Sequence, residues 1–132
     1  MEGKIVAIHG VVVDLQFDEK HTPKVYDALE TQVTKEKKLV LEVEAVLGGG
    51  MVRCVAMGDT YGLRRGMVVK NTGSQIQVPV GEPTLGRLFN VLGEAIDEKG
   101  DVQKTETDTI HKPAPKLTEQ SLKQEVFETG IK

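Results

Sequence analysis

The sequence is poor in aromatic residues and carries no excess of positive charge. Aromatic residues make up 4% of its 132 residues, and tryptophan is absent. Proteins that bind single-stranded nucleic acids stack the bases on exposed aromatic rings, so this composition disfavours a surface of that kind. The formal net charge of −3 also argues against a domain whose main task is to bind phosphate backbones, because that task needs a basic face. A local basic patch remains compatible with these numbers.

Cysteine is nearly absent as well, and long apolar runs are missing. The single cysteine, Cys54, excludes a disulfide within the chain. It lies in the apolar run MVRCVAM, which favours a small buried hydrophobic residue over a reactive thiol. No run reaches the roughly 18 apolar residues of a membrane-spanning helix, and MEGKIVAIHG shows no signal peptide. We therefore expect a cytosolic chain of about one domain with a modest aliphatic core.

Short β-strands dominate the first eighty residues. The segment KLVLEVEAVL at 38–47 alternates apolar and polar residues and is followed by a glycine triplet at 48–50 and the apolar run at 51–57. Two such runs around a glycine turn predict a β-hairpin. The alternation places Glu42 and Glu44 together on a solvated face, where a catalytic role is a poor prediction.

Further short runs continue this pattern. YDALE at 26–30 is ambiguous and could be a strand, and Gly10 predicts a bulge or bend. The remaining predicted strands are KIVAIHGVVVDLQF at 4–17, MVVK at 67–70 and IQVPV at 76–80, with a turn at 71–74. Six short strands at this spacing predict a mainly β fold. Closing so small a sheet removes its exposed edges, so we expect a six-stranded antiparallel β-barrel.

The pattern changes to a helical period after residue 84. In TLGRLFNVLG the apolar residues recur at i, i+3, i+4 and i+7, which predicts a short helix with Thr84 as its N-cap and Gly93 at its end. Gly86 lies inside this predicted helix, where a glycine is unfavourable and suggests close approach of another backbone. The predicted apolar face consists of Leu85, Leu88, Phe89 and Leu92.

The stretch VGEPTLGRL at 80–88 resembles the phosphate-loop frame G-x-x-x-x-G-K-[ST] and fails its chemistry. Arg87 replaces the lysine, and Leu88 offers no hydroxyl to a magnesium ion. Pro83 removes one of the backbone donors. We therefore interpret Gly81 and Gly86 as serving backbone geometry and packing.

The remaining polar residues form no catalytic or metal-binding pattern. The spacing of the three histidines, His9, His21 and His111, links no metal site, so they are interpreted as ordinary surface or loop residues. Asp14 is the more unusual acid because it lies in an apolar strand, although an outward position on a barrel also explains it. No nucleophile, base and oxyanion donor come together. We predict no catalytic, cofactor-binding or metal-binding residue, and a binding or assembly module.

Two loops could in principle contact a ligand. Arg64 and Arg65 in GLRRG could meet a ligand or partner, but a solvated turn is favoured. The triplet at 48–50 could cradle an anion, but such nests lead into a helix and here a strand follows. It is interpreted as a flexible hairpin turn.

The last third of the chain shows no pattern of its own core. DEKGD at 97–101 is a polar turn, KTETDT at 104–109 is charged and poor in strand formers, and HKPAPK at 111–116 reads as a proline-rich linker. Residues 100–132 therefore look like a segment that packs on something else, or like the beginning of a second domain.

Several motifs resemble the beta subunits of F-type ATP synthases. They are VYDALE, LVLEVEAVLGGGMVRCVAMG, GLRRG, VPVGEPTLGRLFNVLGEAID and ETGIK, and the resemblance runs from Gly3 to Lys132 without a large gap. The part from Val80 to Asp97 is similar to both alpha and beta subunits of rotary ATPases. VYDALE and LGGGMVRCVAMG are similar to beta subunits and not to alpha subunits.

The resemblance implies an assembly role. In that family a six-stranded barrel, here residues 1–81, joins alternating alpha and beta subunits into a hexameric crown, and residues 82–132 would begin the α/β nucleotide-binding domain. The family's phosphate loop, catalytic glutamate and adenine-binding residues lie beyond the equivalent of Lys132, so no site residue is carried over. We expect no cofactor in residues 1–132 and no ATP hydrolysis by them, whereas the full-length parent would bind Mg-ATP or ADP.

The resemblance also implies partners and a location. The parent makes ATP from ADP and phosphate with a proton gradient, contacts a central stalk, and binds neither nucleic acid nor the membrane interior. We expect it at the cytoplasmic face of a bacterial plasma membrane, or at an organelle inner or thylakoid membrane.

Two other interpretations remain open. A free-standing β-barrel adaptor that binds nucleic acid is possible for small barrels, although the acidic balance disfavours it. The same region of a flagellar or secretion ATPase shares the LGR segment, but VYDALE and LGGGMVR argue against it.

Overall fold

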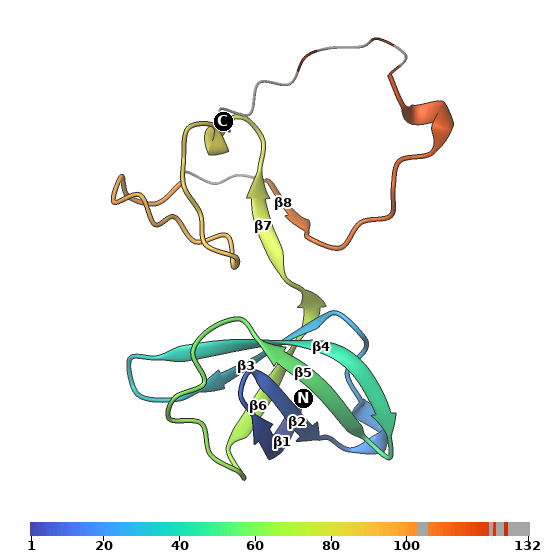
Figure 1. Ribbon diagram of the computed structural model, residues 1–132, viewed down its shortest axis with the longest axis vertical. Helices are drawn as coiled ribbons and strands as arrows, with labels where there is room; N and C mark the ends of the chain where they lie inside the picture. The colour runs from blue at the N-terminus through green and yellow to red at the C-terminus, as the bar shows by residue number, and fades with distance from the viewer. Residues whose placement is uncertain (103–105, 122, 124–125, 127–132) are drawn as a thin grey trace.

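The computed structural model describes residues 1–102, 106–121, 123 and 126. It consists of a closed six-stranded barrel and a two-stranded sheet that projects beyond it, and the molecule narrows between these two parts (Figure 1). All strand pairs are antiparallel, and regular helix is limited to short 3-10 turns. The predicted mainly β fold with a six-stranded antiparallel barrel is therefore confirmed.

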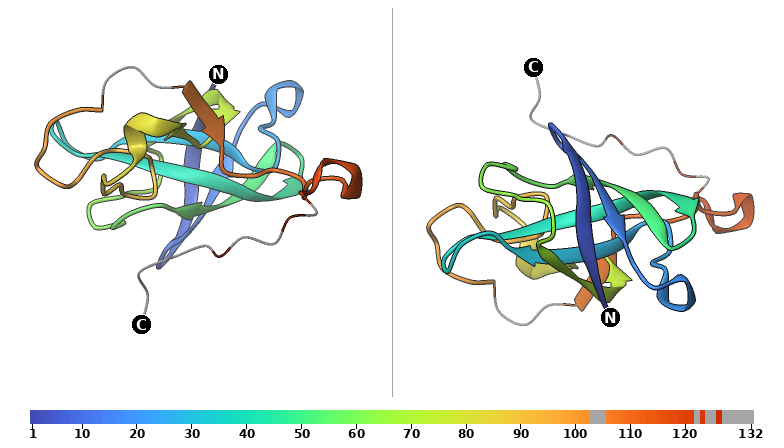
Figure 2. Two further views of the ribbon diagram at one scale, coloured as in Figure 1. Left: turned by 90° about the horizontal axis from the view of Figure 1, so that it is seen from above. Right: turned by 90° about the horizontal axis from the view of Figure 1, so that it is seen from below.

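The barrel is built in the order β1-β2-β5-β4-β3-β6. Its chain path wraps around a common interior, which Figure 2 shows from both ends. A 3-10 turn, Glu19–His21, lies between the second and third strands. The strands are β1 (Glu2–His9), β2 (Val12–Gln16), β3 (Asp27–Gln32), β4 (Lys38–Gly48), β5 (Met51–Ala56) and β6 (Val68–Gln75).

The core inside the barrel is aliphatic, as the composition predicts. Side chains from every barrel strand meet there, and Phe17 is its only aromatic member among the described residues. Cys54 is fully buried, and this burial raises the pKa of its thiol to about 12. Its interpretation as a buried hydrophobic residue is confirmed. The fully buried members are Ile5, Val13, Leu15, Leu29, Leu41, Val43, Val52, Cys54 and Val69.

Glycines make the two tight connections of the barrel. The predicted hairpin forms between β4 and β5, and Gly50 in its turn has φ +76. A Cβ at Gly50 would lie 2.3 Å from the Phe17 carbonyl oxygen, so no larger residue fits there. The bend predicted at Gly10 is also present, with φ +64 between β1 and β2.

The turn predicted at residues 71–74 is wrong, because β6 runs unbroken through it. Gly73 has φ +77, and the Asn71 side chain accepts a hydrogen bond from its amide. The pairing of β3 with β6 shifts register at this point. The polar residues therefore mark a bulge inside a strand, a feature that uses the same residue types as a turn. The ambiguous YDALE segment enters strand β3.

The strand predicted at 76–80 lies outside the barrel. It forms β7 (Gln77–Val80), which pairs only with β8 (Glu106–Thr109) in a separate two-stranded sheet. The segment containing β8 was expected to be poor in strand structure, and that expectation is wrong. Pairing with β7 overrides its weak strand propensity. The domain boundary at residue 81 stays a prediction.

The helix predicted between Thr84 and Gly93 is also wrong. A 3-10 turn, Glu82–Thr84, is followed by turns and by one isolated bridge between Phe89 and Ala95. Gly86 has φ +69, a left-handed conformation that ends any right-handed helix. A Cβ at Gly86 would have nothing within 4 Å, so its φ explains this glycine and close packing does not.

The chain after β8 is mostly irregular, as its prolines predict. Residues 111–116 have no regular structure and lead to a 3-10 turn, Leu117–Glu119. Residues 100–132 were expected to form no core of their own. Part of this segment lies outside the described residues, namely 103–105, 122, 124–125 and 127–132. In the described part, no helix is long and apolar enough to cross a membrane.

Candidate functional site: the barrel surface and the Arg87 loop

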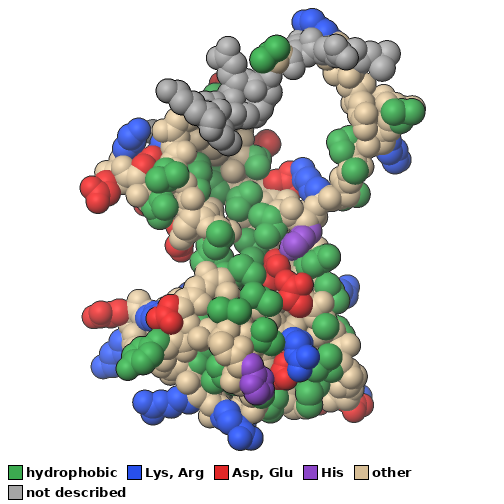
Figure 3. Space-filling view, in the orientation of Figure 1, with side chains coloured by type: hydrophobic (Ala, Val, Ile, Leu, Met, Phe, Trp, Pro, Cys, Tyr) green, Lys and Arg blue, Asp and Glu red, His purple; other side chains and the backbone are tan. Residues whose placement is uncertain are grey.

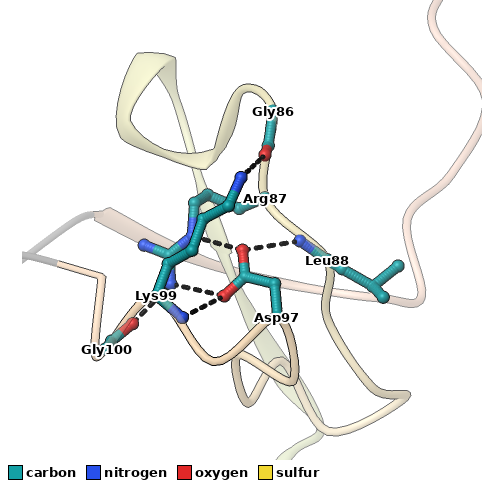
Figure 4. Close-up of polar contacts among 6 residues, drawn as sticks. All are labelled: Gly86, Arg87, Leu88, Asp97, Lys99 and Gly100. Atoms are coloured by element: carbon teal, nitrogen blue, oxygen red, sulfur yellow. Dashed lines mark hydrogen bonds and ion pairs between the residues drawn. The ribbon is translucent and has the colours of Figure 1, made fainter.

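The stretch that resembles a phosphate loop is organised around Arg87. Its guanidinium donates two hydrogen bonds to the Asp97 carboxylate, from Nε to Oδ2 at 2.6 Å and from Nη2 to Oδ1 at 2.9 Å (Figure 4). Both side chains are largely covered, with 15% of Arg87 and 9% of Asp97 exposed. A bidentate pair of this kind fixes direction as well as distance.

Backbone groups complete the surroundings of this pair. The Asp97 carboxylate also accepts hydrogen bonds from the amides of Leu88 at 3.3 Å and Lys99 at 3.2 Å. Arg87 donates additionally to the Gly100 carbonyl. The hydrogen bond from Arg87, followed by those from the two amides, holds the pKa of Asp97 well below its usual range despite opposing desolvation.

This geometry makes Arg87 the closure of a loop. Its charge is neutralised by Asp97, and its Nε and Nη2 groups donate to acceptors within the loop. The only hydroxyl of the stretch, on Thr84, donates to the Gly81 carbonyl at 2.6 Å. The arrangement therefore serves to fix residues 87–100 in place, with Arg87 bound to Asp97 and Lys99 donating to the Gly86 carbonyl at 3.5 Å.

Asp14 is paired rather than solvated. It lies opposite Arg53 in the β2–β5 register, and the guanidinium donates to its two oxygens at 2.8 and 2.9 Å. Asp14 is 8% exposed. The hydrogen bond from Arg53 lowers the pKa of Asp14. The pair stabilises two neighbouring strands, and sequence reasoning identified the acid without its partner.

The placement of Glu42 on a solvated face is wrong. Glu42 is 4% exposed, and its Oε2 lies 2.9 Å from Nε2 of His111, which sequence reasoning treated as an ordinary loop residue. His111 covers Glu42 from the segment after β8, whereas Glu44, at the register shift after Val43, is exposed as predicted. The two partners are 69 residues apart, and no local pattern connects them.

The other residues singled out in the sequence are at the surface. His9, His21, Arg64 and Arg65 are all exposed, and His21 pairs with Asp18 at 3.4 Å. The residues that the structure describes contain no group of acidic, histidine and cysteine side chains able to hold a metal ion. The triplet at 48–50 is the hairpin turn, as predicted.

Several apolar side chains are exposed on the barrel exterior. Figure 3 shows hydrophobic side chains between the barrel and the two-stranded sheet and others scattered over the barrel face. Those exposed on the barrel strands and loops include Val11 at 55%, Val25 at 40%, Val46 at 47%, Leu47 at 46% and Val68 at 46%.

Comparison with known protein families agrees with the barrel. Residues 5–73 match the family model described as the ATP synthase alpha/beta family, beta-barrel domain. The matched residues begin in β1 and end in β6, so they span the six strands of the closed barrel. Barrels of this family take part in the alpha/beta hexamer crown. The chain therefore belongs to the ATP synthase alpha/beta family.

Proposed function

We propose that this chain is the N-terminal part of the catalytic beta subunit of a proton-translocating F-type ATP synthase. Its barrel serves assembly with alternating alpha and beta subunits. The observation that carries the proposal is the coincidence of the family match at 5–73 with a closed barrel. The stretches VYDALE and LGGGMVRCVAMG, which resemble beta subunits, favour this subunit within the family.

The structure of the barrel supports association through side chains. Each of its six strands has two neighbours, so the closed sheet offers no free edge for strand addition. Contacts with neighbouring subunits would instead use apolar side chains such as Val46 and Leu47, next to the β4–β5 turn. In this proposal the crown holds subunits together and the chemistry takes place elsewhere in each subunit.

The nucleotide chemistry belongs, in this proposal, to the full-length parent. The parent would make ATP from ADP and phosphate with a proton gradient, as a peripheral part of a membrane complex. Its phosphate loop would follow Lys132, and residues 82–132 would lead into that domain. The gene of the source tests this point: a G-x-x-x-x-G-K-[ST] sequence within roughly fifty codons after Lys132, between a strand and a helix, is expected.

The second candidate is the same region of another rotary ATPase, such as a flagellar or secretion ATPase. The family match covers alpha and beta chains together, and the LGR segment is shared. This candidate predicts association of the chain with copies of itself, whereas a beta subunit requires alpha subunits between its copies.

The two candidates are distinguished by association with an alpha barrel. We would mix the chain with the corresponding alpha-subunit barrel of the same source and measure masses by sedimentation and native mass spectrometry. Alternating alpha–beta species are expected. Rings of this chain alone, with no affinity for the alpha barrel, would overturn the beta-subunit proposal.

A pair of variants tests the barrel surface itself. Replacing Val46 and Leu47 together by Asp should weaken the alpha–beta association, because it puts charge on an apolar contact surface. Leu117→Asp is the matched control, since Leu117 is 82% exposed and lies beyond the barrel. Equal effects of both changes would mean that the β4–β5 turn takes no part in assembly.

A further inference from the structure

The chain leaves the barrel and returns to it at one place. Ile76, 5% exposed, follows the last barrel strand, and β7 then projects away from the barrel (Figure 1). After β8 the chain comes back, and the Ile110 amide donates to the Ile76 carbonyl at 3.2 Å. The described residues in between, 77–102 and 106–109, form a lobe whose two ends lie side by side.

A side-chain cluster connects the segment after β8 to the barrel. His111 places Nε2 2.9 Å from Oε2 of Glu42 on β4, and the Glu42 side chain is only 5% exposed. The Tyr26 ring stacks on the His111 ring, with centroids 3.8 Å apart and planes inclined by 16°. We call Tyr26, Glu42 and His111 the clasp. Its three members come from three segments that are distant in sequence.

The clasp includes two features that would be unfavourable on their own. A buried carboxylate costs free energy unless it is hydrogen-bonded, and His111 supplies that bond to Glu42. Tyr26 has φ +73, which is uncommon for any residue other than glycine and persists where surrounding contacts compensate. The hydrogen bond to Glu42 forms only while the returning segment lies against the barrel. The Tyr26 backbone is also held within the barrel, by the hydrogen bond from its amide to the Val43 carbonyl at 2.7 Å.

Neighbouring charges already have other partners. Lys112 pairs with Asp108 on its own segment, and the Asp27 carboxylate accepts from Asn71 and from the Lys24 amide. Within the described part of the chain, His111 is the only residue recorded with a side-chain hydrogen bond to Glu42. Besides the clasp, the covalent crossing at Ile76 and the Ile110–Ile76 hydrogen bond link the two parts. Leu92 and Glu94 of the lobe also face the barrel across a shared pocket.

We propose that the clasp acts as a lock, which means that it fixes the orientation of the lobe relative to the barrel. A lobe attached at a single point can rotate about that point, and a second attachment formed by side chains removes this freedom. With the clasp closed, the barrel and the lobe move as one body. With the clasp open, they turn about Ile76 and Ile110. The inference concerns this chain alone and does not depend on the proposed subunit identity.

Residual dipolar couplings of the whole chain test the lock. In the wild type, amide couplings from β7 and β8 should fit the same alignment tensor as those of the barrel. His111→Ala should give β7 and β8 a tensor of their own. Hydrogen exchange of the Ile110 amide should then rise on the order of tenfold or more, the change that loss of a hydrogen bond to a charged group implies.

Matched variants separate unlocking from unfolding. His21→Ala removes another histidine that pairs with a carboxylate, on the exposed barrel surface. The couplings of β7, β8 and the barrel should still fit one alignment tensor in this variant. His111→Gln keeps a donor and should restore the lock in part. If the unpartnered Glu42 charge unfolds the His111→Ala barrel, the double variant Glu42→Gln, His111→Ala removes that charge. A single tensor in both alanine variants of His111, or two tensors in the wild type, would overturn the proposal.

Discussion

Arg87 and Asp97 form a bidentate ion pair that closes the loop between them, with hydrogen bonds of 2.6 and 2.9 Å. The arginine that gives the stretch its likeness to a phosphate loop is thereby occupied by a carboxylate of the same chain. Both side chains are largely covered from solvent. Removal of this ion pair should therefore loosen the loop formed by residues 87–100.

Arg87→Lys is expected to loosen this loop despite keeping the charge. A lysine cannot make the two parallel hydrogen bonds or reach the Gly100 carbonyl at the same time. Hydrogen exchange of the Leu88 and Lys99 amides, both bonded to Asp97, should accelerate. Arg64→Lys in an exposed turn is the control and should change neither amide. Unchanged exchange in the Arg87 variant would contradict the closing role.

Acid should open the same loop. A carboxyl group whose pKa is lower in the folded than in the unfolded state adds stability that is complete above its unfolded pKa, about 3.9 for Asp, and is lost as pH falls further. The pKa values of Asp97 and Asp14 are both lowered by their arginine partners. The denaturant concentration at the unfolding midpoint should therefore decrease as the pH is lowered below about 4.

Asp97→Asn distinguishes the contribution of this residue to the acid response. The variant should start less stable at pH 7 and lose less on acidification, because it has no proton to gain at that position. Denaturation curves at several pH values give both quantities. The same slope with pH in the variant and the wild type would assign the acid sensitivity to other carboxylates.

Gly50→Ala should destabilise the barrel more than Gly10→Ala. Both glycines have positive φ, at +76 and +64, so both alanines bear backbone strain. Only at Gly50 does a Cβ also meet an atom, the Phe17 carbonyl oxygen at 2.3 Å, whereas Gly10 has nothing within 4 Å. Strain alone costs roughly 1–2 kcal/mol. Thermal unfolding of both variants should place Gly50→Ala clearly lower, and equal midpoints would contradict the clash.

The Cys54 thiol should be unreactive in the folded chain. It is fully buried, and this burial raises the pKa of the thiol to about 12. The reactive thiolate is thus scarce, and reagents cannot reach the sulfur. Labelling with a thiol reagent at pH 8 should proceed only as the barrel unfolds, at a rate that rises with denaturant. Rapid complete labelling of the native chain would show that β5 opens readily.

Sequence reasoning succeeded where neighbouring residues decide the structure. The β4–β5 hairpin follows from alternation around a glycine turn, and barrel closure follows from the number and spacing of short strands. The burial of Cys54 follows from its apolar neighbours. In each case local pattern and tertiary packing favour the same arrangement.

It failed where distant segments decide the structure. The apolar spacing from Leu85 to Leu92 resembles a helix, but Gly86 takes a left-handed conformation and the Arg87–Asp97 pair folds the segment into a loop. β8 exists because β7 pairs with it. Glu42 is buried because His111 reaches it from 69 residues away. No window of the sequence contains both partners of such contacts.

Calorimetric titration of the 132-residue chain with Mg-ATP tests the central claim most directly. We assign these residues to assembly and nucleotide binding to other parts of the parent, because Arg87 is occupied by Asp97 and Leu88 offers no oxygen to a metal. This assignment predicts no saturable heat at micromolar to low millimolar nucleotide. Saturable binding in the micromolar range would contradict it and would require a nucleotide site within residues 1–132.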